Sequence, residues 1–155
     1  MVNEVISKEA AEKEWKDFLD EKDANSLIPV EPPKGASKDE IEDYNGKLTS
    51  FNKVVKAITR GLVTIEDGIV TQKLKYPIKG EGGEIIVSEL VYDKRWTAKD
   101  REEAFKGIDS KKADDNFLVS RRMCSKITGV SPIILTKIDG DDQKITDNIV
   151  SVFFM

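Results

Sequence analysis

The residue types that most often perform acid–base, nucleophilic and metal chemistry are nearly absent from this chain. Its 155 residues include no histidine and a single cysteine, Cys124. Ser-His-Asp catalysis, Cys-His catalysis and ordinary zinc sites need histidine or clustered cysteines. Carboxylate, lysine and tyrosine chemistry remains, but no carboxylate has the flanking apolar residues that would indicate an unusual acid or base. The sequence therefore predicts a protein that is not an enzyme and has no catalytic, cofactor-binding or metal-binding residues.

Two local patterns are similar to ligand-binding loops but lack the required spacing. Residues 80–83 contain three glycines without the G-x-G-x-x-G or Walker spacing of phosphate loops, and a strand is expected after them. Residues 139–142 begin like a calcium loop. Its fifth, sixth and twelfth positions are then Gln143, Lys144 and Val150 instead of the residues that bind calcium. We expect a turn at the first pattern, and a turn with a helix N-cap at the second.

The charge of the chain argues against nucleic acid as the partner. The formal net charge is −4, and affinity for nucleic acid comes largely from neutralised phosphates. One small basic cluster, Arg121, Arg122 and Lys126, falls on an expected helix. A solvated helix face is its expected role, with phosphate binding as the alternative.

The last three residues, Phe153, Phe154 and Met155, are the candidate partner-binding residues. The chain is apolar almost to its final residue. An ionised terminal carboxylate is costly to bury unless it is paired, so the end of the chain is expected at the surface. We expect Phe153 to be tucked in and Phe154 or Met155 to be accessible. The cluster then either packs on the core or contacts a partner, since exposed apolar clusters tend to mark interaction sites.

Residues 1–61 are expected to form an N-terminal helical region. A first helix over 1–25 has apolar residues at three- and four-residue spacing, which fits either a helix packed on its own domain or an arm for a partner. A proline-rich linker at 26–36 separates it from a second helix, which begins at a capping box at 37–40. The second helix carries a heptad seam that consists of Ile41, Tyr44, Leu48, Phe51, Val55, Ile58 and Leu62. The seam predicts either a long helix of this domain or self-association through the 41–62 helix as a coiled coil.

Residues 62–155 form the second expected region. From residue 62 the apolar spacing changes from helical to alternating, and Asp67-Gly68 between β-branched runs predicts a hairpin. With the glycine-rich turn this gives a small antiparallel β-meander over about 62–92. The faces expected to be apolar are Leu74, Tyr76 and Ile78 in the middle strand, and Ile86, Leu90 and Tyr92 in the third. Capped helices follow from Thr97, so the predicted fold class is α+β, with N-terminal and C-terminal helices flanking the meander.

The order of short motifs over residues 74–154 resembles the tail assembly chaperones of contractile-tailed bacteriophages, the family of tail protein E. That family has a strand with an apolar-Pro-apolar centre, a glycine turn, a v-x-e-L strand, an R-x-x-x-x-D helix start, an l-T-G-l-s helix end and a final helix ending in Phe. The matching segments are LKYPI at 74–78, VSELVY at 87–92, KRWTAKD at 94–100, ITGVS at 127–131, IDGDD at 138–142 and VFF at 152–154. The family pattern usually begins near its first strand. The resemblance therefore does not account for the 60–70 residues that precede it here.

The resemblance implies a small, non-enzymatic, intracellular protein that keeps the phage tape measure protein soluble during tail assembly. A tape measure protein is a long helical chain with apolar seams, which an acidic helical chaperone can cover while keeping the complex soluble. Two alternatives stay open: a structural component of the phage tail or baseplate, and a small regulatory or nucleic-acid-associated protein. Residues 1–10 lack the features of a signal peptide, and no apolar run could cross a membrane. We therefore expect a protein of the host cytoplasm, where a lone cysteine stays reduced.

Overall fold

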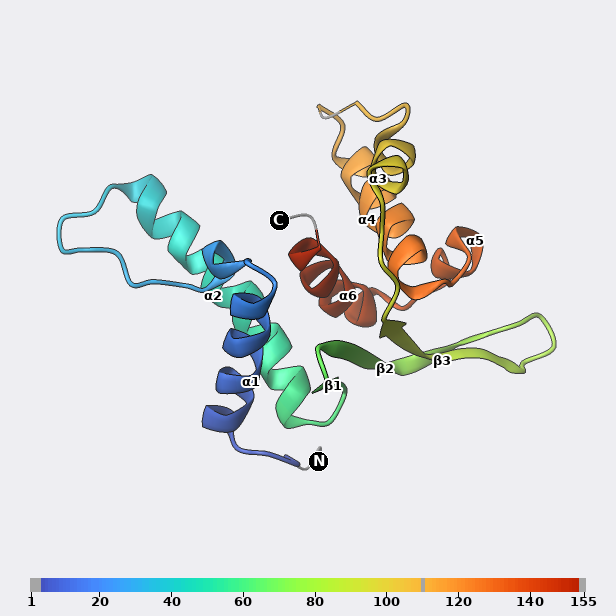
Figure 1. The fold of residues 1–155 in the computed structure, drawn as a ribbon, viewed down its shortest axis with the longest axis horizontal. Coiled ribbons are helices and arrows are strands. Elements are labelled where there is room, and N and C mark those ends of the chain that lie inside the picture. The colour runs from blue at the N-terminus through green and yellow to red at the C-terminus, as the bar shows by residue number, and fades with distance from the viewer. Residues whose placement is uncertain (1–3, 110, 154–155) are drawn as a thin grey trace.

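The computed structural model describes residues 4–109 and 111–153, in which helices flank a three-stranded sheet (Figure 1). Before the sheet come α1 (Lys8–Glu21), the 3₁₀ helix η1 (Asn25–Leu27) and α2 (Lys38–Thr59). The strands are β1 (Val63–Glu66), β2 (Ile69–Lys79) and β3 (Ile85–Tyr92). The later helices are α3 (Ala98–Phe105), α4 (Ala113–Thr128), α5 (Pro132–Leu135) and α6 (Gly140–Val152). The predicted α+β fold class, with a meander between N-terminal and C-terminal helices, is confirmed.

Helix α1 packs against α2 through the apolar positions that its sequence spacing indicates. The Ser7 hydroxyl caps α1 by accepting the amide of Ala10 at 3.1 Å. Four side chains of α1 are buried, namely Ala11, Trp15, Phe18 and Leu19. Burial of each large apolar side chain contributes about 1.5–3 kcal/mol, so this helix is firmly held by its own domain.

Only the second half of α2 enters the core. Phe51, Val55 and Ile58 of the predicted seam are buried, whereas Ile41 is 44% exposed. The first half of the helix projects beyond the sheet, next to the 28–37 loop (Figure 1). The second half of the seam therefore packs inside the domain. Self-association through this helix stays a prediction. A coiled coil could use only the first half of the seam, because the second half is buried in the domain.

The sheet is an antiparallel meander in the order β1-β2-β3. Asp67 and Gly68 form the first turn with φ values of 52° and 76°, the left-handed conformations that a tight hairpin turn requires. Strand β1 pairs only with the first part of β2, from Ile69 to Gln72. Beyond that point β2 and β3 continue as a two-stranded hairpin, which contacts α6 through Lys75 and Tyr76 before its tip extends away from the helices (Figure 1).

The expected position of Tyr76 on the buried face of β2 is wrong. Leu74 and Ile78 are buried, but Tyr76 is 50% exposed. The backbone amides of Lys75 and Tyr76 both donate to the carboxylate of Asp142, at 2.9 Å each. Successive amides of a regular strand point in opposite directions, so two neighbouring amides that share one acceptor require a break in the alternation. Four residues of β2, 74–77, accordingly face a single residue of β3.

The expected face of β3 is correct for two residues of three. Leu90 and Tyr92 are buried, whereas Ile86 is 43% exposed. Ile86 is an extra residue in the ladder, because Ile78 pairs with Val87 and Lys79 pairs with Ile85. A bulge of this kind turns the side chain out of the regular alternation.

Helix α6 lies between the α1–α2 pair and α4, next to the sheet (Figure 1). Its buried apolar residues are Ile149, Val150 and Val152. They join a core cluster that takes residues from α1 and α2 as well as from the sheet and α4. The core therefore spans the expected boundary between residues 1–61 and 62–155.

Candidate functional site

Three of the buried polar side chains form one cluster between β2, β3 and α6. Gln72, Asp142 and Thr146 have exposures of 0%, 1% and 1%. The Gln72 amide donates to the Asp142 carbonyl at 3.1 Å. Its carbonyl oxygen accepts the hydroxyls of Tyr92 at 2.7 Å and of Thr146 at 2.9 Å. No buried side-chain nitrogen or oxygen of the described residues lacks a partner. A fully satisfied network of this kind fixes a helix to a sheet, so the cluster is structural.

Two buried groups, the thiol of Cys124 and the phenol of Tyr92, are held in their neutral forms. Burial raises the pKa of the Cys124 thiol to about 12, so almost no thiolate exists at neutral pH. Burial also raises the pKa of Tyr92 well above its usual value, and its hydroxyl stays a donor to Gln72. Neither residue has the lowered pKa of an activated nucleophile.

Two of the three basic side chains in the α4 cluster, those of Arg122 and Lys126, already bind groups of α3. The Arg122 guanidinium donates to the carbonyls of Ala104 at 2.9 Å and Lys106 at 2.8 Å, at the C-terminal end of α3. Lys126 lies 2.7 Å from Glu103 and 3.6 Å from Asp100. These contacts complement the negative end of α3 and its acidic side chains. They fix α3 on α4 and leave Arg121 as the remaining cation of the cluster.

Phe153, the described member of the predicted partner-binding set, lies at the end of α6. Its ring stacks on Tyr92 with a centroid separation of 6.4 Å and an interplanar angle of 15°. The ring is half-buried beside a hollow of about 500 Å³, which Trp96 and several charged side chains also line. Phe154 and Met155 lie outside the described residues. Contact between these residues and a partner stays a prediction.

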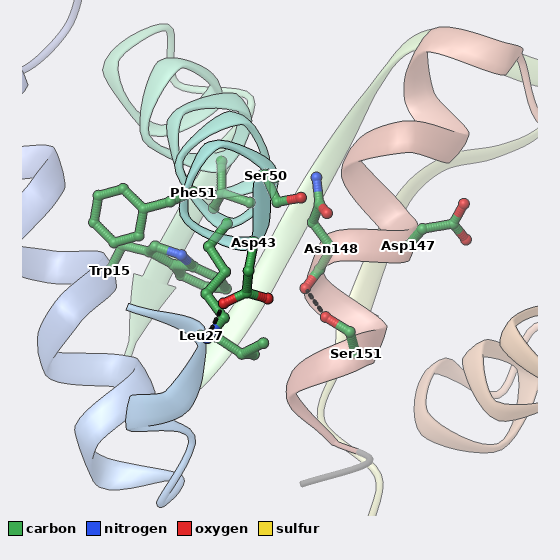
Figure 2. Close-up of a pocket in the computed structure, with 11 residues that line it drawn as sticks. Trp15, Leu27, Asp43, Ser50, Phe51, Asp147, Asn148 and Ser151 are labelled. Atoms are coloured by element: carbon green, nitrogen blue, oxygen red, sulfur yellow. Dashed lines mark hydrogen bonds and ion pairs between the residues drawn. The ribbon is translucent and has the colours of Figure 1, made fainter. Parts of the chain in front are cut away.

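A groove between α2 and α6 is the candidate partner site (Figure 2). Its volume is about 480 Å³, and η1 and α1 close one end. Four apolar side chains line it: Trp15, Leu27, Phe51 and Val54. Trp15 is held in place by stacking on Phe18, with centroids 5.4 Å apart. The groove is thus an apolar hollow that stable elements of the fold keep open.

Small polar residues form the two facing walls of this groove. Gly46 and Ser50 lie one turn apart on α2, and Asn148 and Ser151 lie on α6. In Figure 2 the Ser50 side chain points across the groove toward Asn148. A Cβ atom added at Gly46 would meet nothing within 4 Å, so the wall is recessed there.

The charged side chains around the groove are already engaged. Lys47 pairs with Asp43 at 3.1 Å on the rim. Asp147 accepts from Ser120 at 2.7 Å and from Gln143 at 2.6 Å, and it points away from the groove in Figure 2. Apolar lining with a few polar groups and no free charge is suited to apolar side chains presented by a peptide or helix.

Sequence reasoning missed both Asp142 and the groove. A signal for Asp142 exists: it lies three and seven residues before Ile145 and Ile149, on the inward stripe of α6. Gln72 likewise lies two residues from Val70 and from Leu74, so the strand repeat places it on the same inward face of β2. The groove has no such signal, because it depends on how far α2 and α6 diverge in the folded chain.

No group of three or more His, Cys, Asp or Glu residues within 4–109 and 111–153 could hold a metal ion. No helix in the same part of the chain is long and apolar enough to cross a membrane. Comparisons with models of protein families, with curated proteins and with solved structures found no match.

Proposed function

We propose that this protein is a bacteriophage tail assembly chaperone that binds an apolar helix of the tape measure protein in the groove between α2 and α6. The order of motifs over residues 74–154 supports the family, and the groove supports the mode of binding. The main support for this mode of binding is the apolar hollow of about 480 Å³ between the two helices. In this account the protein acts in the host cytoplasm while the tail is being assembled.

The groove has the properties that helix-in-groove recognition needs. Partner residues at i, i+3, i+4 and i+7 would place their side chains between α2 and α6, against the half-buried Leu27 and over the buried rings of Trp15 and Phe51 that form the floor. The recessed wall at Gly46 and Ser50 lets a second helix approach α2 closely. The exposed first half of α2, residues 38–50, carries four acidic residues and two lysines, which favours a partner helix with basic flanks.

Co-expression with the cognate tape measure protein tests the proposal. The native chaperone is expected to keep the tape measure protein in the soluble fraction and to co-purify with it. A Ser50→Trp variant fills the groove and is expected to lose both effects. Asn52→Trp is the matched control, because Asn52 is exposed on the same helix and does not line the groove.

Two results would contradict the proposal. The first is a tape measure protein that stays insoluble with the native chaperone, which would argue against the function. The second is equal solubilisation by Ser50→Trp and Asn52→Trp, which would leave the function in place and refute the groove as its site. Thermal unfolding of both variants verifies that each is folded.

A second candidate function, a structural component of the tail or baseplate, is favoured by the outer edge of β3. Within the described residues β3 pairs only with β2, and an open edge can accept a strand from a neighbour. Mass spectrometry of purified virions separates the two functions. A chaperone is expected to be absent from finished virions, and stoichiometric amounts would favour the structural function.

A further inference from the structure

The β2–β3 hairpin continues past β1, with one face on the core through Leu74 and Ile78 and its tip projecting from the body of the protein. We call residues 73–89 the arm. It begins where β1 stops pairing with β2, after Gln72, and includes the turn at 80–84 (Figure 1). The arm does not line the α2–α6 groove, so its role is independent of the proposed function.

Charges in the arm are segregated by strand. Its β2 side carries three lysines and no acid: Lys73, Lys75 and Lys79. Its turn and β3 side carry three glutamates and no base: Glu81, Glu84 and Glu89. None of the six takes part in an ion pair within the described residues. The arm thus presents a basic strand beside a turn and strand whose charges are all acidic, and both signs are available to a partner.

The arm also exposes apolar side chains. Ile85 is 60% exposed, Tyr76 is 50% exposed and Ile86 is 43% exposed. Exposed apolar groups surrounded by charge are typical of an interaction surface.

The register of β2 and β3 places a lysine directly opposite a glutamate on the outer face of the arm. Lys73 pairs with Glu89, and Lys79 pairs with Ile85. The neighbouring pairs Gln72 with Leu90 and Ile78 with Val87 point toward the core. The outer face of the arm therefore carries Lys73 beside Glu89 near its base, and Lys79 beside Ile85 toward its tip.

A second copy of the chain fits this pattern in one symmetric arrangement. Pairing two β3 edges would place Glu89 of each copy beside a strand that carries no lysine. Pairing through the edge of β2 is blocked by β1, by Pro77 and by the carboxylate of Asp142. Stacking the outer faces about an axis perpendicular to the strands would place β2 on β2, with lysine against lysine. A two-fold axis parallel to the strands places β2 on β3 of the second copy.

We propose that two copies of the chain associate by stacking the outer faces of their arms about a two-fold axis parallel to the strands. Lys73 then faces Glu89 of the second copy, and the reciprocal contact follows from the symmetry. Lys79 covers Ile85 of the second copy with its aliphatic stem. Faces of packed sheets lie about 10 Å apart, a distance that lysine and glutamate side chains span together.

Sedimentation of charge-reversed variants tests this dimer. The native protein is expected to change from 17.4 kDa toward twice that mass over about 1–300 µM, the range of weak interfaces. Lys73→Glu with Lys79→Glu makes both strands acidic, and Glu84→Lys with Glu89→Lys makes both basic. Each double variant alone is expected to stay monomeric, and an equimolar mixture of the two is expected to dimerise. Lys34→Glu, in the exposed 28–37 loop, is the control for a charge reversal away from the arm and is expected to dimerise like the native protein.

The mixture distinguishes arm stacking from general effects of charge. A native protein that is monomeric throughout, or double variants that still dimerise alone, would overturn the proposal. So would monomeric double variants whose mixture does not dimerise, or a Lys34→Glu control that loses the dimer. Dimerisation that survives both double variants and is lost in Ile41→Asp would assign self-association to α2 instead.

Discussion

Replacing Asp142 tests how α6 is joined to the sheet. Its carboxylate is 1% exposed and accepts two backbone amides of β2, those of Lys75 and Tyr76, at 2.9 Å each. In Asp142→Ala both amides lose their acceptor, at a position where the backbone has left the regular ladder.

The expected cost follows from the number of hydrogen bonds lost. Hydrogen bonds to charged groups contribute about 1.5–3 kcal/mol each, and two are removed while some water re-enters. We expect Asp142→Ala to lower the free energy of unfolding by about 3 kcal/mol. For a domain of this size that corresponds to a fall in Tm of about 6–12 °C. Asp142→Asn retains one acceptor oxygen and is expected to lose about half as much.

Urea unfolding followed by circular dichroism measures the change in free energy, and hydrogen exchange locates it. The amides of Lys75 and Tyr76 are expected to exchange faster in Asp142→Ala. The amide of Lys73, which donates to the Leu62 carbonyl at 2.7 Å, is expected to be less affected. Asp141→Ala, an exposed neighbour in the same helical turn, is the control and is expected to change stability by no more than about 0.5 kcal/mol. If Asp142→Ala unfolds like Asp141→Ala and both amides keep their native exchange rates, the carboxylate does not hold the bulge and the reasoning is refuted.

Three further predictions concern other parts of the fold. Gly129→Ala is expected to lose about 1–2 kcal/mol, because φ is 78°, a left-handed conformation that an L residue with a Cβ rarely adopts. Gly46→Ala, in open space within α2, is expected to gain about 0.5–1 kcal/mol, and urea midpoints of the two variants measure the contrast. The raised pKa of Cys124, about 12, keeps the native thiol protonated where the unfolded thiol ionises, so stability falls as pH rises from about 9 toward 12. Between pH 8 and 10 this loss is about 1.4 kcal/mol, and Cys124→Ala is expected to remove it; an unchanged pH dependence would contradict the assignment. Arg122→Met is expected to speed hydrogen exchange throughout α3, and unchanged exchange would show that the arginine does not fix that helix on α4.

Local signals predicted most of the elements because each element has its own sequence pattern. The Thr97–Asp100 capping box begins α3 as expected, with both of its reciprocal hydrogen bonds formed. The Asp67-Gly68 turn joins β1 and β2 as expected. The spacing of Trp15 and Phe18 predicts the inward face of α1 because a helix repeats every 3.6 residues wherever it packs.

The features that sequence reasoning missed depend on contacts between distant segments. Tyr76 is exposed because Asp142, 66 residues later, takes its amide out of the ladder. Arg122 and Lys126 look like a basic cluster until α3 supplies their partners. The groove likewise requires α1, α2 and α6 to be placed together. Alternation and helical periodicity report on neighbours within an element, so they carry no information on such contacts.

Photo-crosslinking from inside the groove shows whether the tape measure protein occupies it. A photoreactive amino acid replaces Ser50 in one variant and Asn52 in another, each co-expressed with the cognate tape measure protein and irradiated in the cell. If the partner helix lies in the groove, we expect a crosslink to the tape measure protein from position 50, mapped by mass spectrometry to an amphipathic helix, and little or none from position 52. Equal crosslinking from both positions, or none from position 50 while the two proteins still co-purify, would contradict the groove as the partner site.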